Sequence, residues 1–381
     1  MSHARPEPDV PSTHSGRVPF PRDSGQGQEG GERLPDPRQD RPRAQRLPGL
    51  TAAVILAVLC LVGFGFTLLN FAGAIRVFTV EAVVSALLLT AVGVLGFWVL
   101  RRIRPVRAPG LASSLAALLW GATGAIGLAL FTNSNLMSAW SRAGGLEFGT
   151  TWGAALTAPV NEELLKVTGV VLIAVMAPRA VRGPIDGFVI GALVGLGFQL
   201  VENFTYALNA ISMQGATDGM LSVLQTFFLR IGLTGLGSHW AMSAVAGTAV
   251  GVLAAVAWRP DARRAAGAAL LLLLAMGVHW FFDSPLLENL AGVLIKTLTV
   301  FVIAMAVYFA ARHAYRGRVR RALAEEGEEL GVRRSSAVAL ATRHGRRAEL
   351  GRVARPERPA VRARQEQMVA MAEDRASEYR A

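Results

Sequence analysis

The sequence predicts an all-α fold, a polytopic membrane helical bundle of about eight transmembrane helices with disordered polar tails. Of its 381 residues, 52% are hydrophobic, and the mean hydropathy is +0.38. The apolar residues are gathered in long runs, and a run of about 20 is enough to cross a bilayer. Arginine is concentrated in the tails and in alternate loops, as it is where loop charge sets the orientation of a membrane protein. Together these features exclude a soluble globular enzyme.

The chain begins with a polar tail, residues 1–48, which is rich in Pro, Gly and Arg. It has too little apolar surface to offset the entropy lost on ordering, so we expect it to be disordered and cytoplasmic. Two accessory transmembrane helices follow in 49–110, then a core in 111–312 and a charged cytoplasmic C-terminal tail in 313–381. The expected spans are 50–70, 80–100, 111–131, 148–177, 187–211, 226–258, 266–286 and 291–311.

The sixth of these runs is irregular. It is too long for one simple helix, and it contains Arg230 together with three glycines, Gly232, Gly235 and Gly237. We therefore predict that residues 221–237 form an interfacial or re-entrant piece that leads into a helix near Ser238. Irregular backbone at membrane depth is tolerated only against protein or a wet cavity.

The loops indicate the orientation of the chain in the membrane. Arginine clusters follow the second, fourth, sixth and eighth spans, while several of the alternate loops carry Glu147, Asp218 or Glu288 instead. By the positive-inside rule both termini are cytoplasmic, which an even number of spans allows. The clustered arginines are Arg101, Arg102, Arg104, Arg107, Arg179, Arg182, Arg259, Arg263, Arg264, Arg312, Arg316, Arg318, Arg320 and Arg321.

Composition also limits the partners. The net charge is +12, and its placement favours contact with the lipid bilayer. No aromatic residues interleave with the basic ones, so we expect no nucleic-acid partner. Cys60 is the single cysteine, which excludes an internal disulfide and makes thiolate catalysis or a cysteine-rich metal site an unsuitable reading.

The most informative stretch is Asn161-Glu162-Glu163-Leu164-Leu165-Lys166, which lies inside the apolar run 148–177. Ionised groups at that depth cost at least a few kcal/mol each, so they are usually paired and usually functional. On a helix, Lys166 would lie one turn after both glutamates and could pair with one of them.

Other predicted helices also carry ionisable residues in their apolar interiors. These residues are Glu202, His239, His279 and Asp283. Counting from the cytoplasmic loops at about 1.5 Å per residue places Glu162 and Glu202 at roughly 24 Å, His239 at roughly 27 Å, and His279 and Asp283 at roughly 21–27 Å. The helices alternate in direction, so this agreement indicates one shared site in the outer half of the bilayer.

Two histidines with several carboxylates suit two hydrolytic chemistries. In one, Zn²⁺ held by His239, His279 and Glu202 polarises a water molecule. In the other there is no cofactor, and a desolvated glutamate takes the proton from water while imidazole stabilises the oxyanion. A third reading, from another functional class, is a proton-coupled membrane transporter that uses the same residues as a relay.

Each residue also has a plain structural reading. His239 alone could be an ordinary core histidine, and His279 with Asp283 an ordinary buried pair at i and i+4. Glu163 with Lys166 could be a purely structural ion pair. The common depth of the group is what favours a site.

Four motifs in order resemble those of the PrsW-type intramembrane proteases, distant relatives of the type II CAAX prenyl endopeptidases. Glu162-Glu163-Leu164-Leu165-Lys166 resembles an E-E-x-x-K motif, and Phe198 to Asn203 resembles F-x-x-x-E-N. His239, with Gly247 and Gly251 after it, resembles the third motif, and His279 to Asp283 resembles H-x-x-x-D. The resemblance covers the core, about 111–312.

The resemblance implies an intramembrane endopeptidase whose substrate is a membrane-anchored protein, such as the anti-sigma factor that the type member cuts, and no small-molecule cofactor. The family has been described both as metalloproteases and as glutamic peptidases. The catalytic set it implies is Glu162, Glu163, Glu202, His239, His279 and Asp283. By analogy with the prenyl endopeptidases, Glu162 would be the general base.

Overall fold

A computed structural model describes residues 43–378, and every regular element among them is helical. The described residues fall into two compact units, a bundle up to Tyr315 and a C-terminal unit from Arg316. One helix, α10 (Leu290–Glu329), runs from the first unit into the second. Most of the N-terminal tail predicted to be disordered lies outside the described residues.

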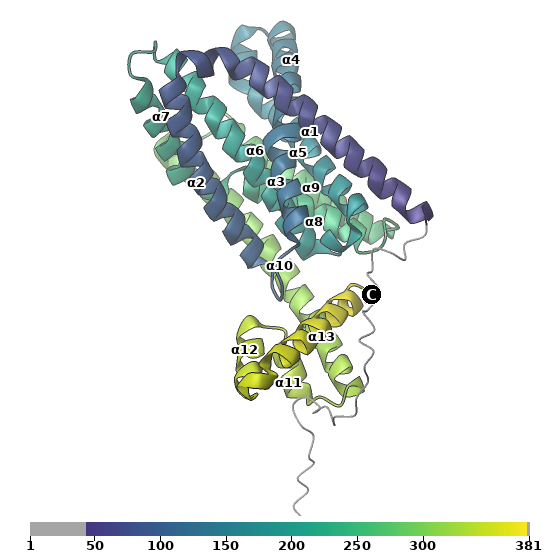
Figure 1. Cartoon of the computed structure of the whole chain (residues 1–381). Coiled ribbons are helices and arrows are strands. Elements are labelled where there is room, and N and C mark those ends of the chain that lie inside the picture. The colour runs from purple at the N-terminus through teal and green to yellow at the C-terminus, as the bar shows by residue number, and fades with distance from the viewer. Residues whose placement is uncertain (1–42, 379–381) are drawn as a thin grey trace, which may run out of the picture. The chain divides into compact units, whose positions relative to one another are not determined.

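The bundle is made of the expected helices, drawn in Figure 1. Its long helices are α1 (Arg43–Val77), α2 (Thr79–Ile103), α4 (Ile126–Gly144), α5 (Leu146–Met176), α6 (Pro184–Met213), α8 (His239–Ala254) and α9 (Ala262–Asp283), with α10. Shorter elements are α3 (Leu111–Leu119), α7 (Gly219–Phe227), two π-helical segments, η1 (Trp120–Ala125) and η3 (Phe228–Leu233), and two 3₁₀ turns, η2 (Pro178–Ala180) and η4 (Gly235–Gly237).

Among the described residues, 7 helices are long and apolar enough to cross a membrane. They coincide with seven of the predicted runs, and the third is longer than expected, because α3, η1 and α4 form one continuous stretch over Leu111–Gly144. The remaining predicted run is α5, which has 31 residues but is interrupted by Asn161, Glu162, Glu163 and Lys166. The helical membrane bundle predicted from the sequence is thus confirmed.

The irregular sixth run is broken where the sequence predicted, just before a helix that starts near Ser238. Residues Gly219–Leu233 make a short apolar helix that ends in π-helical geometry, and α8 begins at His239 with Ser238 as its N-cap. Gly237 lies against the backbone of Thr297 in α10, where a Cβ atom would have no room. The break therefore fixes the position of His239 at the start of a buried helix.

The centre of the bundle is α6, which is 83% buried over its apolar stretch, whereas α1 is 11% buried over its own. Glycine makes the close packing of α6 on α8 feasible, because small residues let helix backbones approach. Gly191 lies against Ser243 and Gly247, and Gly195 lies against the carbonyl group of His239. These glycines let the backbones of α6 and α8 approach each other beside His239.

A buried charge cluster joins α2, α6 and α10 at the arginine-rich end of the bundle. Arg104 Nε donates to Asp186 Oδ1 at 2.6 Å, and its Nη2 donates to the hydroxyl of Tyr315 at 3.0 Å. The backbone N–H of Arg182 donates to Asp186 Oδ2 at 3.1 Å. This cluster ties an accessory helix to the core.

The C-terminal tail contradicts one expectation, since it is not disordered between Arg334 and Glu378. It forms α11 (Arg334–Ala339), α12 (Arg343–Gly351), the 3₁₀ turn η5 (Arg355–Glu357) and α13 (Arg358–Glu378). Its apolar residues recur at helical spacing, and Val361, Met368, Val369, Ala372 and Ala376 are all buried. Because most residues of the segment are polar or charged, this narrow apolar stripe is hard to recognise in the sequence.

Candidate active site

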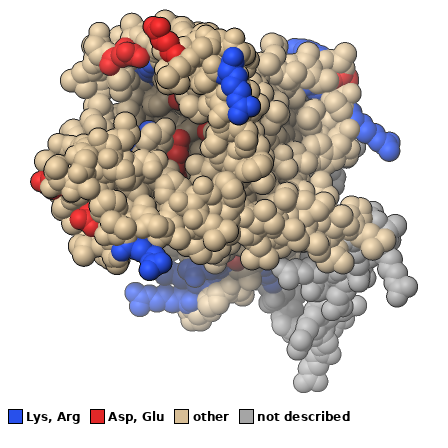
Figure 2. Space-filling view, turned by 90° about the horizontal axis from the view of Figure 1, so that it is seen from above, with Lys and Arg blue, Asp and Glu red and all other residues tan. Residues whose placement is uncertain are grey.

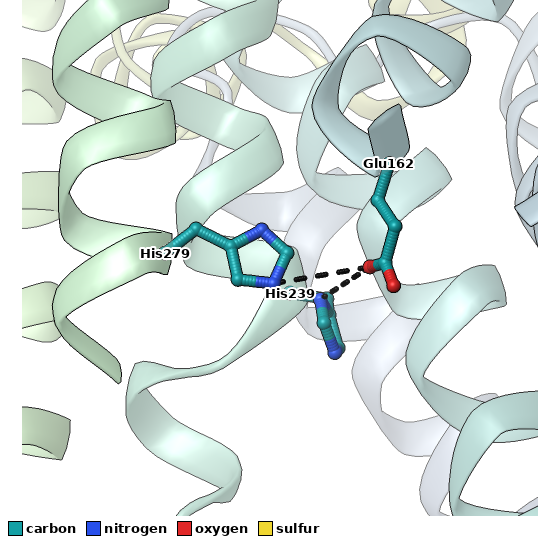
Figure 3. Close-up of side chains that lie close together, drawn as sticks. All are labelled: Glu162, His239 and His279. Carbon is teal, nitrogen blue, oxygen red and sulfur yellow. Dashed lines mark ion pairs between the residues drawn. The ribbon is translucent and has the colours of Figure 1, made fainter. Parts of the chain in front are cut away.

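Glu162 lies at the centre of a buried group of ionisable side chains. Its Oε2 is 3.8 Å from Nδ1 of His239 and 3.8 Å from Nε2 of His279, as Figure 3 shows. These residues come from α5, α8 and α9, and all three are buried. Helices distant in the sequence thus bring one carboxylate and two imidazoles together.

Each imidazole contacts a second carboxylate through the ring nitrogen that faces away from Glu162. His279 Nδ1 lies 3.0 Å from Glu163 Oε1, and His239 Nε2 lies 2.7 Å from Glu202 Oε2. Because an ionised carboxylate only accepts hydrogen bonds, these two ring nitrogens are the donors. The opposite nitrogen of each ring therefore faces Glu162.

Lys166 is the cation inside this acidic group, and it is fully buried. Its Nζ donates to Glu163 Oε1 at 2.8 Å and lies 3.3 Å from Glu162 Oε2, which confirms the pairing predicted along α5. It also lies 3.0 Å from His239 Nδ1 and 4.3 Å from the centre of the Phe198 ring. The ammonium group thus balances the charge of adjacent carboxylates.

Glu202 finds its partners on other helices, as its isolation on α6 requires. Besides His239, its Oε2 accepts from Arg230 Nη2 at 2.7 Å. Arg230 Nε donates to Asn203 Oδ1 at 2.6 Å, and the guanidinium lies 3.8 Å from the centre of the Tyr206 ring. The π-helical segment η3 carries Arg230, and such segments occur often at functional sites.

The end of α9 is fixed by two contacts. Asp283 Oδ2 lies 3.2 Å from His279 Nε2, although not in hydrogen-bond geometry, and Asp283 remains partly exposed at 23%. Lys296 of α10 donates to the carbonyl oxygen of Ser284 at 2.6 Å, just beyond the helix end. The second of the two lysines thus also supports the site.

Asn133 is a site residue that sequence reasoning missed. Its Nδ2 donates to Glu162 Oε1 at 2.9 Å, and its Oδ1 accepts from Asn161 Nδ2 at 2.7 Å. Because these contacts hold Oε1, they direct Oε2 of Glu162 toward the two histidines. The polar run Thr132-Asn133-Ser134-Asn135 was the available signal, but the predicted third span ended at residue 131.

A cavity of about 390 Å³ reaches this group. Glu162, Glu202, His239, Arg230 and Asp283 are among its lining residues. The lining also includes Met137, Ala154 and Asn209, which lie toward the α4–α5 and α6–α7 connections. Figure 2 looks onto this end of the bundle and shows a hollow with acidic side chains inside it. Polar substrate atoms and water therefore have a route to Glu162.

The comparison with known protein families now bears on this geometry. The family model described as PrsW family intramembrane metalloprotease matches residues 110–311, more than half of the chain. The chain belongs to the PrsW family. No curated protein and no solved structure matches it. The protein is therefore a multi-pass intramembrane peptidase, and the family assignment favours hydrolysis over the transporter interpretation.

The family is described as one of metalloproteases, and a group of buried residues in this PrsW member could hold a metal ion. Glu162, His239 and His279 offer ligand atoms that all lie within 4.8 Å of one another, and Glu162 Oε2 and His279 Nε2 are buried without a hydrogen-bond partner. Metal-binding histidines usually donate their other N–H to a carboxylate, as both do here. One carboxylate and two imidazoles are also a known zinc-binding set. The donor set fits a divalent metal, which would replace the Lys166 ammonium, 3.0 Å away, as the neighbour of His239 Nδ1.

The structure refines the predicted roles without testing catalysis. Glu162, Glu163, Glu202, His239, His279 and Asp283 all lie in one group of contacts, and their catalytic roles stay a prediction. Glu202 was predicted as a metal ligand, but its Oε2 is held by Arg230 and His239, and Glu162 lies in the converging set instead. The geometry therefore favours Glu162 as the carboxylate nearest to a bound ion.

Proposed function

We propose that Glu162 activates a water molecule that this peptidase uses to cut a peptide bond in a membrane-anchored protein. The observation that carries the proposal is the environment of Oε2, which is buried, makes no hydrogen bond, lies 3.3 Å from the Lys166 ammonium and faces two imidazoles. A carboxylate placed in this way is suited to take a proton. In the intact protein the cavity brings substrate and water to it.

The proposed reaction needs no covalent intermediate. Glu162 takes a proton from water, and the oxygen of that water forms a bond to the carbonyl carbon of the substrate. Glu162 then returns the proton to the leaving amide nitrogen as the C–N bond breaks. General acid–base catalysis of this kind typically contributes about 10²- to 10⁴-fold.

The other residues are proposed to hold this centre in order. His239 and His279 stabilise the oxyanion or bind the ion, and Glu202 and Glu163 orient their rings through the contacts at 2.7 and 3.0 Å. Asp283 orients His279 from the cavity side. Lys166 balances the charge of Glu162 and Glu163.

We propose Zn²⁺ as the metal, which His239 and His279 would hold, while Glu162, whose Oε2 lies 3.8 Å from both rings, stays the base. When bound, such an ion polarises a carbonyl group and lowers the pKa of water. The test is to dialyse the purified enzyme against a chelator and to measure zinc and cleavage together. Loss of both, with cleavage restored by added Zn²⁺, supports the metal. Full cleavage without bound zinc would leave Glu162 as a metal-free general base.

The proposed substrate class is a protein with an apolar membrane anchor, for example an anti-sigma factor. An apolar groove of about 440 Å³ between α2 and α10 supports this class, with Leu95, Leu236 and Phe301 among its lining residues. Two of its lining residues are next in sequence to site residues, since Trp240 follows His239 and Ile231 follows Arg230. A membrane-anchored substrate needs an apolar groove for its anchor near the hydrolytic centre.

We also propose that both termini are cytoplasmic and that the cavity opens on the opposite side. The arginine-rich loops support this orientation. In a Cys60→Ala background, a cysteine at Glu147 should react with a membrane-impermeant maleimide on intact cells, and one at Arg179 should not. The reverse pattern would invert the topology.

The experiment that tests the function compares membrane proteomes of wild-type cells and a Glu162→Gln strain. The proposal predicts at least one single-span protein that is shortened in the wild type and intact in the variant. Proteomes that do not differ under any growth condition in which the enzyme is expressed would reject it.

A further inference from the structure

The C-terminal unit contains a cavity of its own, of about 370 Å³, between α12 and α13. From α12 it is lined by Arg343, Arg346, Arg347 and Leu350, and from α13 by Arg362, Gln365 and Glu366. The first set has the spacing i, i+3, i+4, i+7 and the second i, i+3, i+4, so each lies on one helix face. Four arginines therefore stand around one cavity with a single glutamate.

Most arginines of this cavity make no hydrogen bond or ion pair within the described part of the chain. Within the described part of the chain, Arg343, Arg347 and Arg362 are exposed and have no hydrogen bond or ion pair. Arg346 is anchored, because its Nη1 donates to the carbonyl oxygen of Leu340 at 2.6 Å. Like charges gathered without partners attract an anion.

Gln365 is a second, independent observation. It is only 2% exposed, it lines the cavity, and its Nε2 has no hydrogen-bond partner. A buried donor without an acceptor is unfavourable, and an oxygen atom of a bound ligand would satisfy it. The neighbouring Leu350 is half-buried and offers a small apolar contact.

We propose that this cavity binds a phosphate group. Guanidinium groups bind phosphate oxygens through paired, charge-assisted hydrogen bonds, and Gln365 adds a neutral donor. The helix α12 begins at Arg343, so the positive end of its dipole adds to the same field. The volume is within the range of small-ligand sites. The site is independent of the peptidase centre.

Two sources carry this chemistry, the headgroup of an anionic phospholipid and a soluble phosphate compound. Both are tested on the full chain in nanodiscs made either of phosphatidylcholine alone or with added phosphatidylglycerol. Inorganic phosphate is titrated by calorimetry at constant ionic strength. We expect saturable binding in phosphatidylcholine. If phosphatidylglycerol abolishes it, a headgroup fills the cavity; if binding is equal in both lipids, the ligand is soluble.

Matched charge reversals locate the site. Arg347→Glu should weaken phosphate binding at least tenfold, whereas Arg355→Glu, an exposed arginine of η5 outside the cavity, should change it less than twofold. Gln365→Leu should weaken binding a few-fold without lowering the unfolding temperature, because its Nε2 supports no contact in the fold. Arg347→Gln serves as a milder variant if the reversal does not fold.

Two results would overturn the proposal. One is the absence of saturable phosphate binding in both lipids, together with hydrogen exchange at the amides of α12 and α13 that is the same in the two lipids. The other is equal weakening by Arg347→Glu and Arg355→Glu, which would reduce the effect to net charge.

Discussion

Two buried polar clusters in the bundle differ in how completely their atoms are paired. In the Arg104–Asp186 cluster, both oxygens of Asp186 and all three nitrogens of the Arg104 guanidinium group make hydrogen bonds. In the Glu162 cluster, Glu162 Oε2 and His279 Nε2 make no hydrogen bond, although charged groups of Lys166 and Asp283 lie 3.3 and 3.2 Å from them, and a cavity reaches Glu162. The first arrangement stabilises the fold, whereas the second leaves buried groups ready to bind and react.

The contrast extends to the neighbours of the site. Within residues 43–315, the other buried side-chain atoms without hydrogen-bond partners are Gln199 Oε1, Asn203 Nδ2 and Ser238 Oγ. Each lies within one helical turn of Glu202 or His239 in the sequence. Unsatisfied polar atoms are rare in folded proteins, so their clustering here favours the proposal that this region is functional.

The largest expected effect is on stability at the paired cluster. Arg104→Ala leaves Asp186 buried without its main partner, which should lower the free energy of unfolding by about 3–5 kcal/mol. Chemical denaturation in detergent, followed by circular dichroism, measures the change. The double change Arg104→Met with Asp186→Leu should recover most of the loss, and a double variant as unstable as Arg104→Ala would contradict this account.

The next effect is on catalysis, at the Glu162 cluster. His279→Ala removes an imidazole that faces Glu162 and should reduce the cleavage rate about 10²- to 10³-fold, with the unfolding midpoint little changed. The control is His313→Ala, an exposed histidine of α10. Equal rates for the two variants in reconstituted membranes would remove His279 from the mechanism.

A smaller effect is expected at the residue that orients the base. Asn133→Ala removes the hydrogen bond to Glu162 Oε1, and a bond to a charged group contributes about 1.5–3 kcal/mol. We therefore expect kcat to fall about tenfold or more while KM stays constant. Asn135→Ala, next to it on α4 but bonded only to the Phe131 carbonyl oxygen, is the matched control. A change confined to KM would argue against an orienting role.

The smallest effect again compares the clusters. Tyr315→Phe removes one acceptor of Arg104 and should cost about 1 kcal/mol of stability. Tyr206→Phe, beside Arg230 at the cavity, should leave stability unchanged, because the ring rather than the hydroxyl contacts the guanidinium. The denaturation midpoints of the two variants are compared. An equal loss of stability in both would show that the two clusters do not differ in how much their hydrogen bonds stabilise the fold.

The sequence predicted the site well wherever its residues lie within apolar helices. Glu162, Glu202, His239 and His279 were recognisable because ionisable groups are costly at that depth, and their common depth placed them together. The break before α8 was also predictable, because Gly232, Gly235 and Gly237 accompany Arg230 in a run too long for one helix.

The rest depends on tertiary contacts that local patterns do not encode. Asn133 reaches Glu162 only because η1 and α4 extend the third span beyond its apolar run. The choice of Glu162 rather than Glu202 beside both histidines depends on Arg230, which holds Glu202 from a separate π-helical segment. In the C-terminal unit, charge density hid an apolar stripe of only a few residues.

The central claim is that the Glu162 cluster, in which two buried atoms lack hydrogen bonds, reacts, while the Arg104–Asp186 cluster only stabilises the fold. The most direct measurement is the cleavage rate per folded molecule of Glu162→Gln and Asp186→Asn, side by side in liposomes with the substrate found by proteome comparison. We predict that Glu162→Gln loses at least about 100-fold, as expected for a general base, while Asp186→Asn stays within a few-fold of wild type. Cleavage by Glu162→Gln at the rate of the wild type, or an equal loss in both variants, would contradict the account.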